Sequence, residues 1–199
     1  MKIKFAPLTA LIIGSTLVLA GCSGTSGDVS STGHGGHSGG STPEASVDAN
    51  AADLMFAAMM IGHHQQAIEM SDIVLAKSGV DEQVVALAER IKAAQQPEID
   101  QLTEWVTAWG GDVADYTDMG HGDGMMSADD MAALESADGP QASVLFLEQM
   151  IVHHEGAVEM AEEEVGSGQN PDAITLAEKI ITDQKAEISE MQDLLDTLR

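Results

Sequence analysis

The chain has 199 residues, and its 33 acidic against 8 basic side chains give a formal net charge of −25 at pH 7. This charge argues against nucleic-acid binding, which needs a basic surface, and against docking of the folded part on anionic lipid. A single cysteine excludes a disulfide framework, a cysteine-based zinc site and an iron–sulfur cluster. Aromatic residues make up only 3% of the chain, which favours a helical bundle over a β-sandwich.

Residues 1–21 are predicted to be an export signal rather than part of the fold. Lys2 and Lys4 precede an apolar stretch, residues 5–20, that is too short and too abruptly ended for a stable membrane span. The sequence Leu-Ala-Gly-Cys at positions 19–22 then looks like a bacterial lipobox. We therefore expect Cys22 to carry lipid and to anchor the protein outside the cytoplasm, on the cell membrane or the outer membrane. The alternative is an ordinary secretory peptide with an incidental cysteine.

The mature chain divides into a tether and a repeated region. Residues 22–47 are rich in Gly, Ser and Thr and cannot bury a core, so a flexible tether is expected. Within residues 48–199, two pairs of matching segments follow in the same order, about 90 residues apart. Segment 56–70 matches 146–160, and a later segment that begins at Leu87 matches one that begins at Leu176. This region is therefore interpreted as a duplicated two-segment unit.

Each segment of the repeat has helical spacing, with buried-type positions recurring in steps of three and four. Residues 48–111 are expected to form a first helical hairpin and residues 140–199 a second one. Residues 112–139 form a connection that is long for a bundle. Because neither hairpin can bury its apolar face alone, the expected fold is an all-α, ferritin-like four-helix bundle.

Capping residues mark where these helices begin and end. Gly79 is a candidate cap after the first helix, and Asp81 is placed to start the second. Ser127 begins a short helix inside the connection, and Asn170 followed by Pro171 opens the last helix.

The strongest functional signal is a pair of adjacent histidines near the middle of the first helix of each hairpin. Methionines three or four residues before each pair and six or seven after it share a helix face with the histidines. A two-fold relation between the two hairpins places the middles of their helices at the same height along the bundle. The histidine pairs are therefore expected to face each other across the core. Imidazole with thioether sulfur favours copper, and the Glu-x-x-His part of the ferritin-like di-iron pattern is missing. The predicted metal ligands are Met60, His63, His64, Met70, Met150, His153, His154 and Met160.

These residue types also have a structural interpretation. Methionine often fills irregular gaps in a core, as we expect of Met55, Met59 and Met131, and buried histidines can form a hydrogen-bonded polar cluster. The connection holds a second candidate site, because sulfur and imidazole on a glycine-rich segment suit the capture and release of a soft cation. An ordinary surface loop is the alternative there. The residues of this loop site are Met119, His121, Met125 and Met126.

The other helix of each hairpin carries a repeated polar set. Glu89, Gln95 and Glu98 match Glu178, Gln184 and Glu187. These side chains either hydrogen-bond the second nitrogen of a ligand histidine or form ion pairs on the surface.

The pattern Met-x-x-His-His-x-x-Ala-[Ile/Val]-Glu-Met, followed by Leu-Ala-x-x-Ile-x-x-x-Gln-x-x-Glu-Ile, resembles a known family over residues 50–199. It is similar to the bacterial secreted proteins known as domain of unknown function 305, which have a ferritin-like four-helix fold. Some members are periplasmic copper binders, and the resemblance implies copper ligation by the eight residues named above. The two copies differ in places: the first has Gln65 and Gln66 where the second has Glu155 and Gly156.

The expected function is metal binding outside the cytoplasm by a lipid-anchored protein that buffers copper, confers tolerance to it or transfers it. A metal-dependent oxidase on the same scaffold and a structural or interaction lipoprotein without metal are the alternatives. The sequence favours a protein without enzymatic activity, although it leaves this question open, and it predicts no organic cofactor. Its expected partners are the metal ion, the membrane through Cys22, and a metallochaperone or a second copy of the chain.

Overall fold

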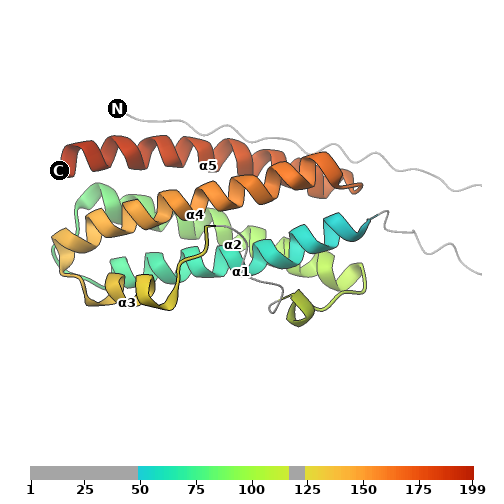
Figure 1. Ribbon diagram of the computed structural model, residues 1–199, viewed down its shortest axis with the longest axis horizontal. Coiled ribbons are helices and arrows are strands. Elements are labelled where there is room, and N and C mark those ends of the chain that lie inside the picture. Colours follow the sequence, from blue (N-terminus) through green and yellow to red (C-terminus); the bar gives the residue numbers. More distant parts are fainter. Residues whose placement is uncertain (1–48, 117–123) are drawn as a thin grey trace, which may run out of the picture. The chain divides into compact units, whose positions relative to one another are not determined.

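The computed structural model describes residues 49–116 and 124–199, and this part of the chain is helical with no strand. Four long helices lie side by side and a short fifth helix packs on their flank (Figure 1). The elements are α1 (Ala51–Leu75), α2 (Glu82–Ala108), the 3₁₀ helix η1 (Val113–Tyr116), α3 (Ala128–Ser136), α4 (Gly139–Ser167) and α5 (Pro171–Leu198).

The helices begin where the capping residues predicted. The side chain of Asp81 accepts the backbone N–H of Gln83 at the start of α2. Ser127 and Asp130 form a capping box at the start of α3. Asn170 accepts two backbone N–H groups at the start of α5, with Pro171 in the first turn.

The turn between α1 and α2 differs in detail from the expectation. The cap residue of α1 is Ala76, in a right-handed helical conformation. Gly79 lies beyond it in the turn, with φ of 81°. This left-handed backbone is costly for residues with a side chain, so glycine serves the turn rather than the helix end itself.

The four long helices form two hairpins, α1 with α2 and α4 with α5, which meet along α1 and α4. The start of α1 lies at the end of α4, where Asn50 Nδ2 donates to the carbonyl of Ser167 at 2.9 Å. Hence α1 and α4 run antiparallel. Long side chains link α2 to α5, among them Lys179, which donates to Glu98 at 2.8 Å. This is the ferritin-like four-helix architecture that the sequence predicted.

The bundle interior consists of two apolar clusters with polar residues between them. One cluster, at the α3 end, includes Phe146, Leu147, Met70 and Leu134. The other, at the start of α1, includes Phe56 and Leu102, and the four long helices contribute to both clusters. Between them lies a buried polar layer, which we call the histidine layer: His63 and His64 of α1, Gln95 and Glu98 of α2, His153 and His154 of α4, and Gln184 of α5.

A buried carboxylate ties the start of α1 to the turn between α4 and α5. Asp53 is fully buried and accepts backbone N–H groups of Asn50, Gln169 and Asn170 at 2.5, 3.0 and 2.8 Å. Burial alone would raise the pKa of Asp53, but these backbone hydrogen bonds outweigh it and lower the pKa. Nearby Glu164 is also buried, and burial together with Asp53 raises its pKa to about 8.

Several predicted features lie outside the described residues: the signal at 1–21, the whole tether at 22–47 with Cys22, and the loop candidates Met119 and His121. Of the helices that the structure does describe, none has the length and apolar character needed to cross a bilayer.

Candidate functional site

His63 and His153 meet in the middle of the histidine layer. Their ring centroids are 3.7 Å apart, with the ring planes inclined at 43°. Both side chains are buried, one from α1 and the other from α4. Because α1 and α4 are antiparallel copies of one repeat, equivalent residues meet here, near the pseudo-two-fold axis. The histidine pairs therefore face each other across the core, as the sequence led us to expect.

The second histidine of each pair is held by a carboxylate from its own hairpin. His64 Nε2 lies 2.9 Å from Glu98 Oε2, and His154 Nε2 lies 2.7 Å from Glu187 Oε2. An ionised carboxylate only accepts, so Nε2–H is the donor and Nδ1 keeps the lone pair. Within the described part of the chain, Nδ1 of His64 and of His154 is buried without a hydrogen-bond partner. These two Nδ1 atoms are therefore candidate ligands for a metal ion.

Burial favours the neutral form of His64 and of His153 by lowering the pKa of each. Burial is the main cause that lowers the pKa of His64, against the opposing effect of Glu98. It lowers the pKa of His153 well below the usual value, and the neighbouring His63 and His154 reinforce the shift. Neutral imidazole is also the form in which histidine binds a metal ion.

Glu98 joins the histidine layer to the surface. It accepts from His64 and from Lys179 Nζ of α5, the latter at 2.8 Å. Burial would raise the pKa of Glu98, but hydrogen bonds from His64 and Lys179 outweigh burial and lower it. Glu98 therefore has both roles that the sequence left open, histidine partner and ion-pair member. The contact of Lys179 with Glu98 could not be predicted from the sequence, because the two residues lie 81 positions apart.

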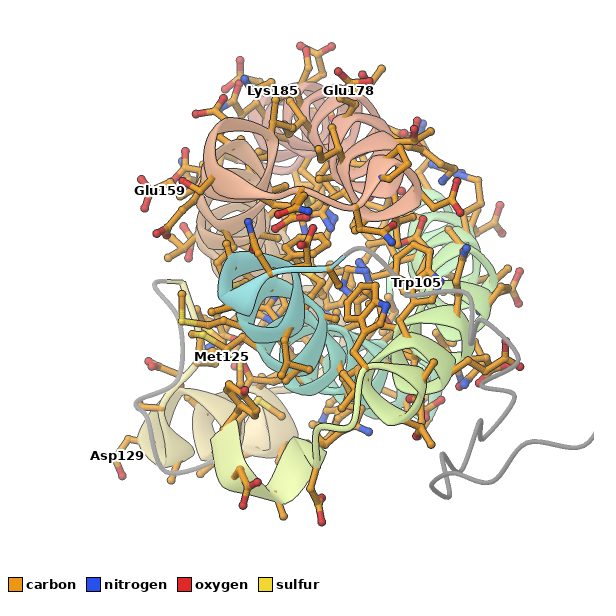
Figure 2. All side chains as sticks on the ribbon, turned by 90° about the vertical axis from the view of Figure 1, so that its right-hand side faces the viewer. Trp105, Met125, Asp129, Glu159, Glu178 and Lys185 are labelled. Atoms are coloured by element: carbon orange, nitrogen blue, oxygen red, sulfur yellow. The ribbon has the colours of Figure 1, made fainter. Side chains whose placement is uncertain are left out.

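The rest of the repeated polar set separates into buried and exposed members. Gln95 and Gln184 are buried in the histidine layer. Glu89 and Glu178 are exposed, and Figure 2 shows Glu178 pointing away from the bundle. Helical spacing explains the division. Glu98 and Glu187 lie three residues after Gln95 and Gln184 and share their face, whereas Glu89 and Glu178 lie six residues before them, on a different face.

The four predicted methionines occupy different places. Met60, Met70 and Met150 are fully buried. Met60 belongs to the cluster at the start of α1, whereas Met70 and Met150 belong to the cluster at the α3 end, so sulfur lies on both sides of the histidine layer. Met160 differs, because it is only half-buried and lines a small surface pocket with Met55 and Met59. Met160 is thus more exposed than Met70, its counterpart in the first copy of the repeat.

The end of the connection packs beside the histidine layer. Gln66, one turn after His63, donates to the carbonyl of Met126 at 2.9 Å and accepts the Met126 N–H at 2.7 Å. Gly124, with φ of 90°, lies so close to α4 that a Cβ there would be 3.0 Å from the Cα of Gly156. The difference between the repeats, Gln66 in one and Gly156 in the other, thus accommodates residues 124–126 at the end of the connection.

The imidazole nitrogens lie between two apolar clusters that contain methionine, and they do not form a ready-made site for a hard metal ion. In the described segments, no three His, Cys, Asp or Glu side chains are grouped to hold a metal ion. Two imidazoles touch at the centre, two more offer Nδ1, and thioethers lie above and below them. This donor set fits a soft ion of low coordination number better than zinc or a carboxylate-bridged di-iron pair.

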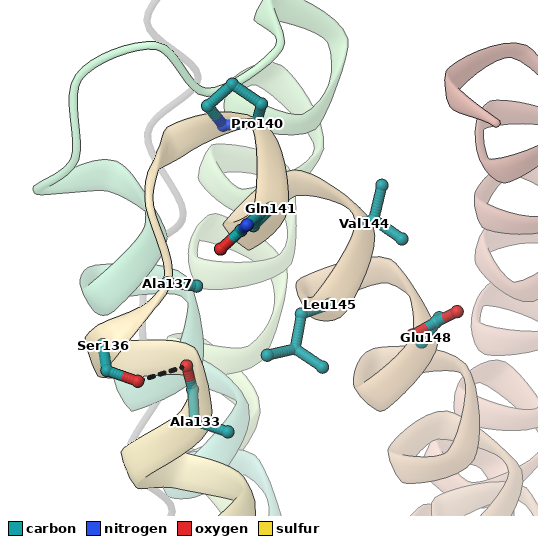
Figure 3. A pocket seen from close by; sticks show the side chains of 8 residues that line it. All are labelled: Ala133, Ser136, Ala137, Pro140, Gln141, Val144, Leu145 and Glu148. Atoms are coloured by element: carbon teal, nitrogen blue, oxygen red, sulfur yellow. Dashed lines mark hydrogen bonds between the residues drawn. The ribbon is translucent and has the colours of Figure 1, made fainter.

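A separate depression lies between α3 and α4 (Figure 3). It has a volume of about 590 Å³ and is lined mainly by Ala, Pro, Val and Leu. Its one titratable side chain, Glu148, pairs with Arg199. The depression therefore offers no group of reactive side chains, and the candidate chemistry belongs to the histidine layer.

Comparison with known proteins agrees with this architecture. The family model described as "Domain of unknown function (DUF305)" matches residues 53–195. The chain belongs to this family. No curated protein matches the chain.

Solved structures of the family share the fold. A DUF305 protein of Streptomyces coelicolor, assigned to the secreted proteins, is 34% identical with a TM-score of 0.68, over 74% of this chain and 93% of its own. A DUF305 fragment from Deinococcus radiodurans is 28% identical with a TM-score of 0.66, over 75% of this chain and 98% of its own. CopM in its Cu(II)-bound form is 31% identical with a TM-score of 0.64, over 74% of this chain and 97% of its own. CopM has also been solved with Cu(I) and with Ag bound.

Proposed function

We propose that this protein binds copper outside the cytoplasm, through the histidine layer, and buffers or hands on the ion while a lipid on Cys22 holds the chain at a membrane. The observation that carries the metal proposal is the contact between His63 and His153, together with the buried Nδ1 atoms of His64 and His154, which have no hydrogen-bond partner in the described residues. The copper-bound and silver-bound forms of CopM support the choice of metal.

The proposed ligands act as a mixed nitrogen and sulfur set. Imidazoles of His63 and His153 bind the ion at the centre, with His64 and His154 beside them. Met60, Met70 and Met150 supply thioethers, which select Cu(I) over zinc or magnesium. Met160, by its position in the surface pocket, is left out of this central set.

The surface of the protein favours delivery of a cation. The formal net charge is −25, and side chains such as Glu159 and Glu178 point outward from the bundle (Figure 2). A field of this sign raises the local concentration of cations and speeds their arrival.

Competition with a Cu(I) chelator tests the proposal. The variant His63→Gln with His153→Gln is expected to bind Cu(I) at least tenfold more weakly than the wild type. The matched control, His34→Gln with His37→Gln, changes two histidines of the tether and is expected to leave the affinity unchanged. Equal affinity in all three proteins, with native far-UV circular dichroism, would remove the histidine layer as a copper site and leave the polar-cluster interpretation.

Cell fractionation tests the anchor separately. In cells fed a labelled fatty acid, the full chain is expected in the membrane fraction with the label attached. Cys22→Ser is expected to lose the label and leave the membrane fraction. A labelled or membrane-bound Cys22→Ser protein would contradict lipidation at this residue.

A further inference from the structure

A small pocket away from the histidine layer gathers three more sulfur atoms. Met55 and Met59 of α1 and Met160 of α4 line it, together with Ala52, Phe56, Glu163 and Glu164. Its volume is about 60 Å³, too small for an organic ligand, since such ligands occupy roughly 300 Å³ or more. The three methionine residues are half-buried, and the pocket that they line is partly open to solvent.

The helix geometry brings the three thioethers within reach of one ion. Met55 and Met59 are one turn apart on α1, which separates their Cβ atoms by about 6 Å. Met160 lies on α4, which packs against α1. Three flexible side chains converging on one cavity can adjust to a trigonal arrangement around a single ion.

Packing alone does not require sulfur here, as the other end of the bundle shows. The repeat places Leu145 and Gln149 where Met55 and Met59 stand, and Ile73 and Val74 where the two glutamates stand. At that end α3 covers the surface: Gln149 donates to the carbonyl of Asp130, and α3 inserts its buried leucine into the core.

The two ends therefore differ in chemistry as well as in cover. The pocket is lined by residues of α1 and α4 alone. Met55, Glu163 and Glu164 stand where the other end has aliphatic side chains, whereas Met59 matches Gln149 and Met160 matches Met70. Glu163, at the exposed edge, adds negative charge.

We propose that this pocket is a second metal site, in which Met55, Met59 and Met160 bind one soft monovalent cation, Cu(I) or Ag(I), independently of the histidine layer. Thioether ligands without imidazole select soft, closed-shell ions and reject Zn²⁺ and Mg²⁺. The proposal stands on residues other than those of the proposed function, so each can fail without the other.

Silver binding to the mature chain tests this site. The triple variant Met55→Leu, Met59→Leu and Met160→Leu keeps side-chain volume and removes all three sulfur atoms. Native mass spectrometry is expected to show one Ag(I) fewer per molecule than in the wild type. Met131→Leu, a half-buried methionine on α3, is the matched control and is expected to retain the full number. An unchanged number in the triple variant would overturn the proposal.

Methionine oxidation gives a second, site-resolved readout. Hydrogen peroxide converts accessible methionines to sulfoxides, and a bound ion blocks the sulfur lone pairs. One equivalent of Ag(I) beyond that taken by the histidine layer is expected to slow oxidation of Met55, Met59 and Met160 together, measured by peptide mass spectrometry. The protection must persist in His63→Gln with His153→Gln. Unprotected oxidation of these three residues would contradict the site, whatever the histidine variant does.

A single substitution covers the case in which the triple variant fails to fold. Met59→Leu removes one of the three sulfur atoms and is expected to weaken Ag(I) retention in the pocket at least tenfold. Full retention by a folded Met59→Leu protein would count against a three-thioether site.

Discussion

Gln66 of α1 and Met126 of the connection are joined by two hydrogen bonds, in which the Gln66 amide donates to and accepts from the Met126 backbone. The Gln66 amide thus satisfies the backbone N–H and the carbonyl of Met126, which in a strand or a helix would bond to other backbone groups. The contact fixes the end of the connection against α1, one turn from His63. Gly124, two residues earlier, lies against Val152 and Gly156 of α4, so this end of the connection packs on both helices that carry the histidine pairs.

Replacing Gln66 by Ala is expected to destabilise the protein by about 1–2 kcal/mol, because two hydrogen bonds of about 1 kcal/mol each are lost. Urea unfolding gives the free energy difference. Gln65→Ala, an exposed neighbour, is the control and should change stability by less than about 0.5 kcal/mol. Equal losses in the two variants would show that the contact with Met126 adds nothing to stability.

Gly124→Ala and Gly110→Ala form a matched pair for the close approach of the connection to α4. Both glycines have positive φ, 90° and 78°, so alanine costs about 1 kcal/mol at either position. A Cβ at Gly124 would also lie 2.6 Å from the carbonyl oxygen of Val152, whereas a Cβ at Gly110 meets open space. Gly124→Ala should therefore cost about 1–3 kcal/mol more in urea unfolding. An equal loss of unfolding free energy in the two variants would mean that the backbone around residue 124 moves to accommodate the added Cβ without strain.

Glu98→Ala should leave the Nε2–H of His64 buried and unpaired, at a cost of about 1–3 kcal/mol in the free energy of unfolding. Glu89→Ala removes an exposed carboxylate from the same helix and should be nearly neutral. Chemical denaturation of both variants at neutral pH gives the comparison. A neutral Glu98→Ala variant would indicate that another group satisfies His64.

Glu164 predicts a loss of stability with rising pH. Burial and the neighbouring Asp53 raise its pKa from 4.5 to about 8, so the folded protein holds this proton more tightly than the unfolded chain. The resulting stabilisation is complete below the unfolded pKa and is lost as the pH rises through 8. Between about pH 5 and pH 9 the wild type should lose about 1–2 kcal/mol relative to Glu164→Gln, after allowance for screening by solvent.

Thermal unfolding at a series of pH values checks this prediction. Glu164→Gln keeps the shape of the side chain and cannot ionise, so its melting temperature should exceed that of the wild type at the alkaline end. The carboxylates other than Asp53, which interacts with Glu164, are common to both proteins, and their contribution cancels in the comparison. Parallel pH profiles would show that Glu164 titrates normally.

The fold could be predicted from the sequence because its signals are local or repeated. Capping groups at Asp81, Ser127 and Asn170 act within three residues of themselves, so they can be recognised without a structure. The repeated histidine pairs implied two equivalent hairpins, and equivalence placed His63 opposite His153.

The contacts that the sequence did not predict join distant segments. Lys179 reaches Glu98 and Gln169 reaches Asp53 across 81 and 116 residues, and neither pair has a characteristic spacing. Met160 fits the repeat as well as Met70 does, yet only the folded bundle shows that one is half-buried and the other fully buried. Helical periodicity identifies the inward face of a helix. It does not identify which parts of that face a neighbouring element leaves open.

Each apolar cluster takes side chains from both hairpins. A lone hairpin would therefore have half of each cluster exposed to water, and could bury it only against another hairpin. The chain is in this sense a dimer whose two subunits share one backbone, and the connection makes their association independent of concentration. Because both copies lie in one chain, they can also differ in sequence: α3 covers one end of the bundle, whereas the other end has the pocket lined by Met55, Met59 and Met160.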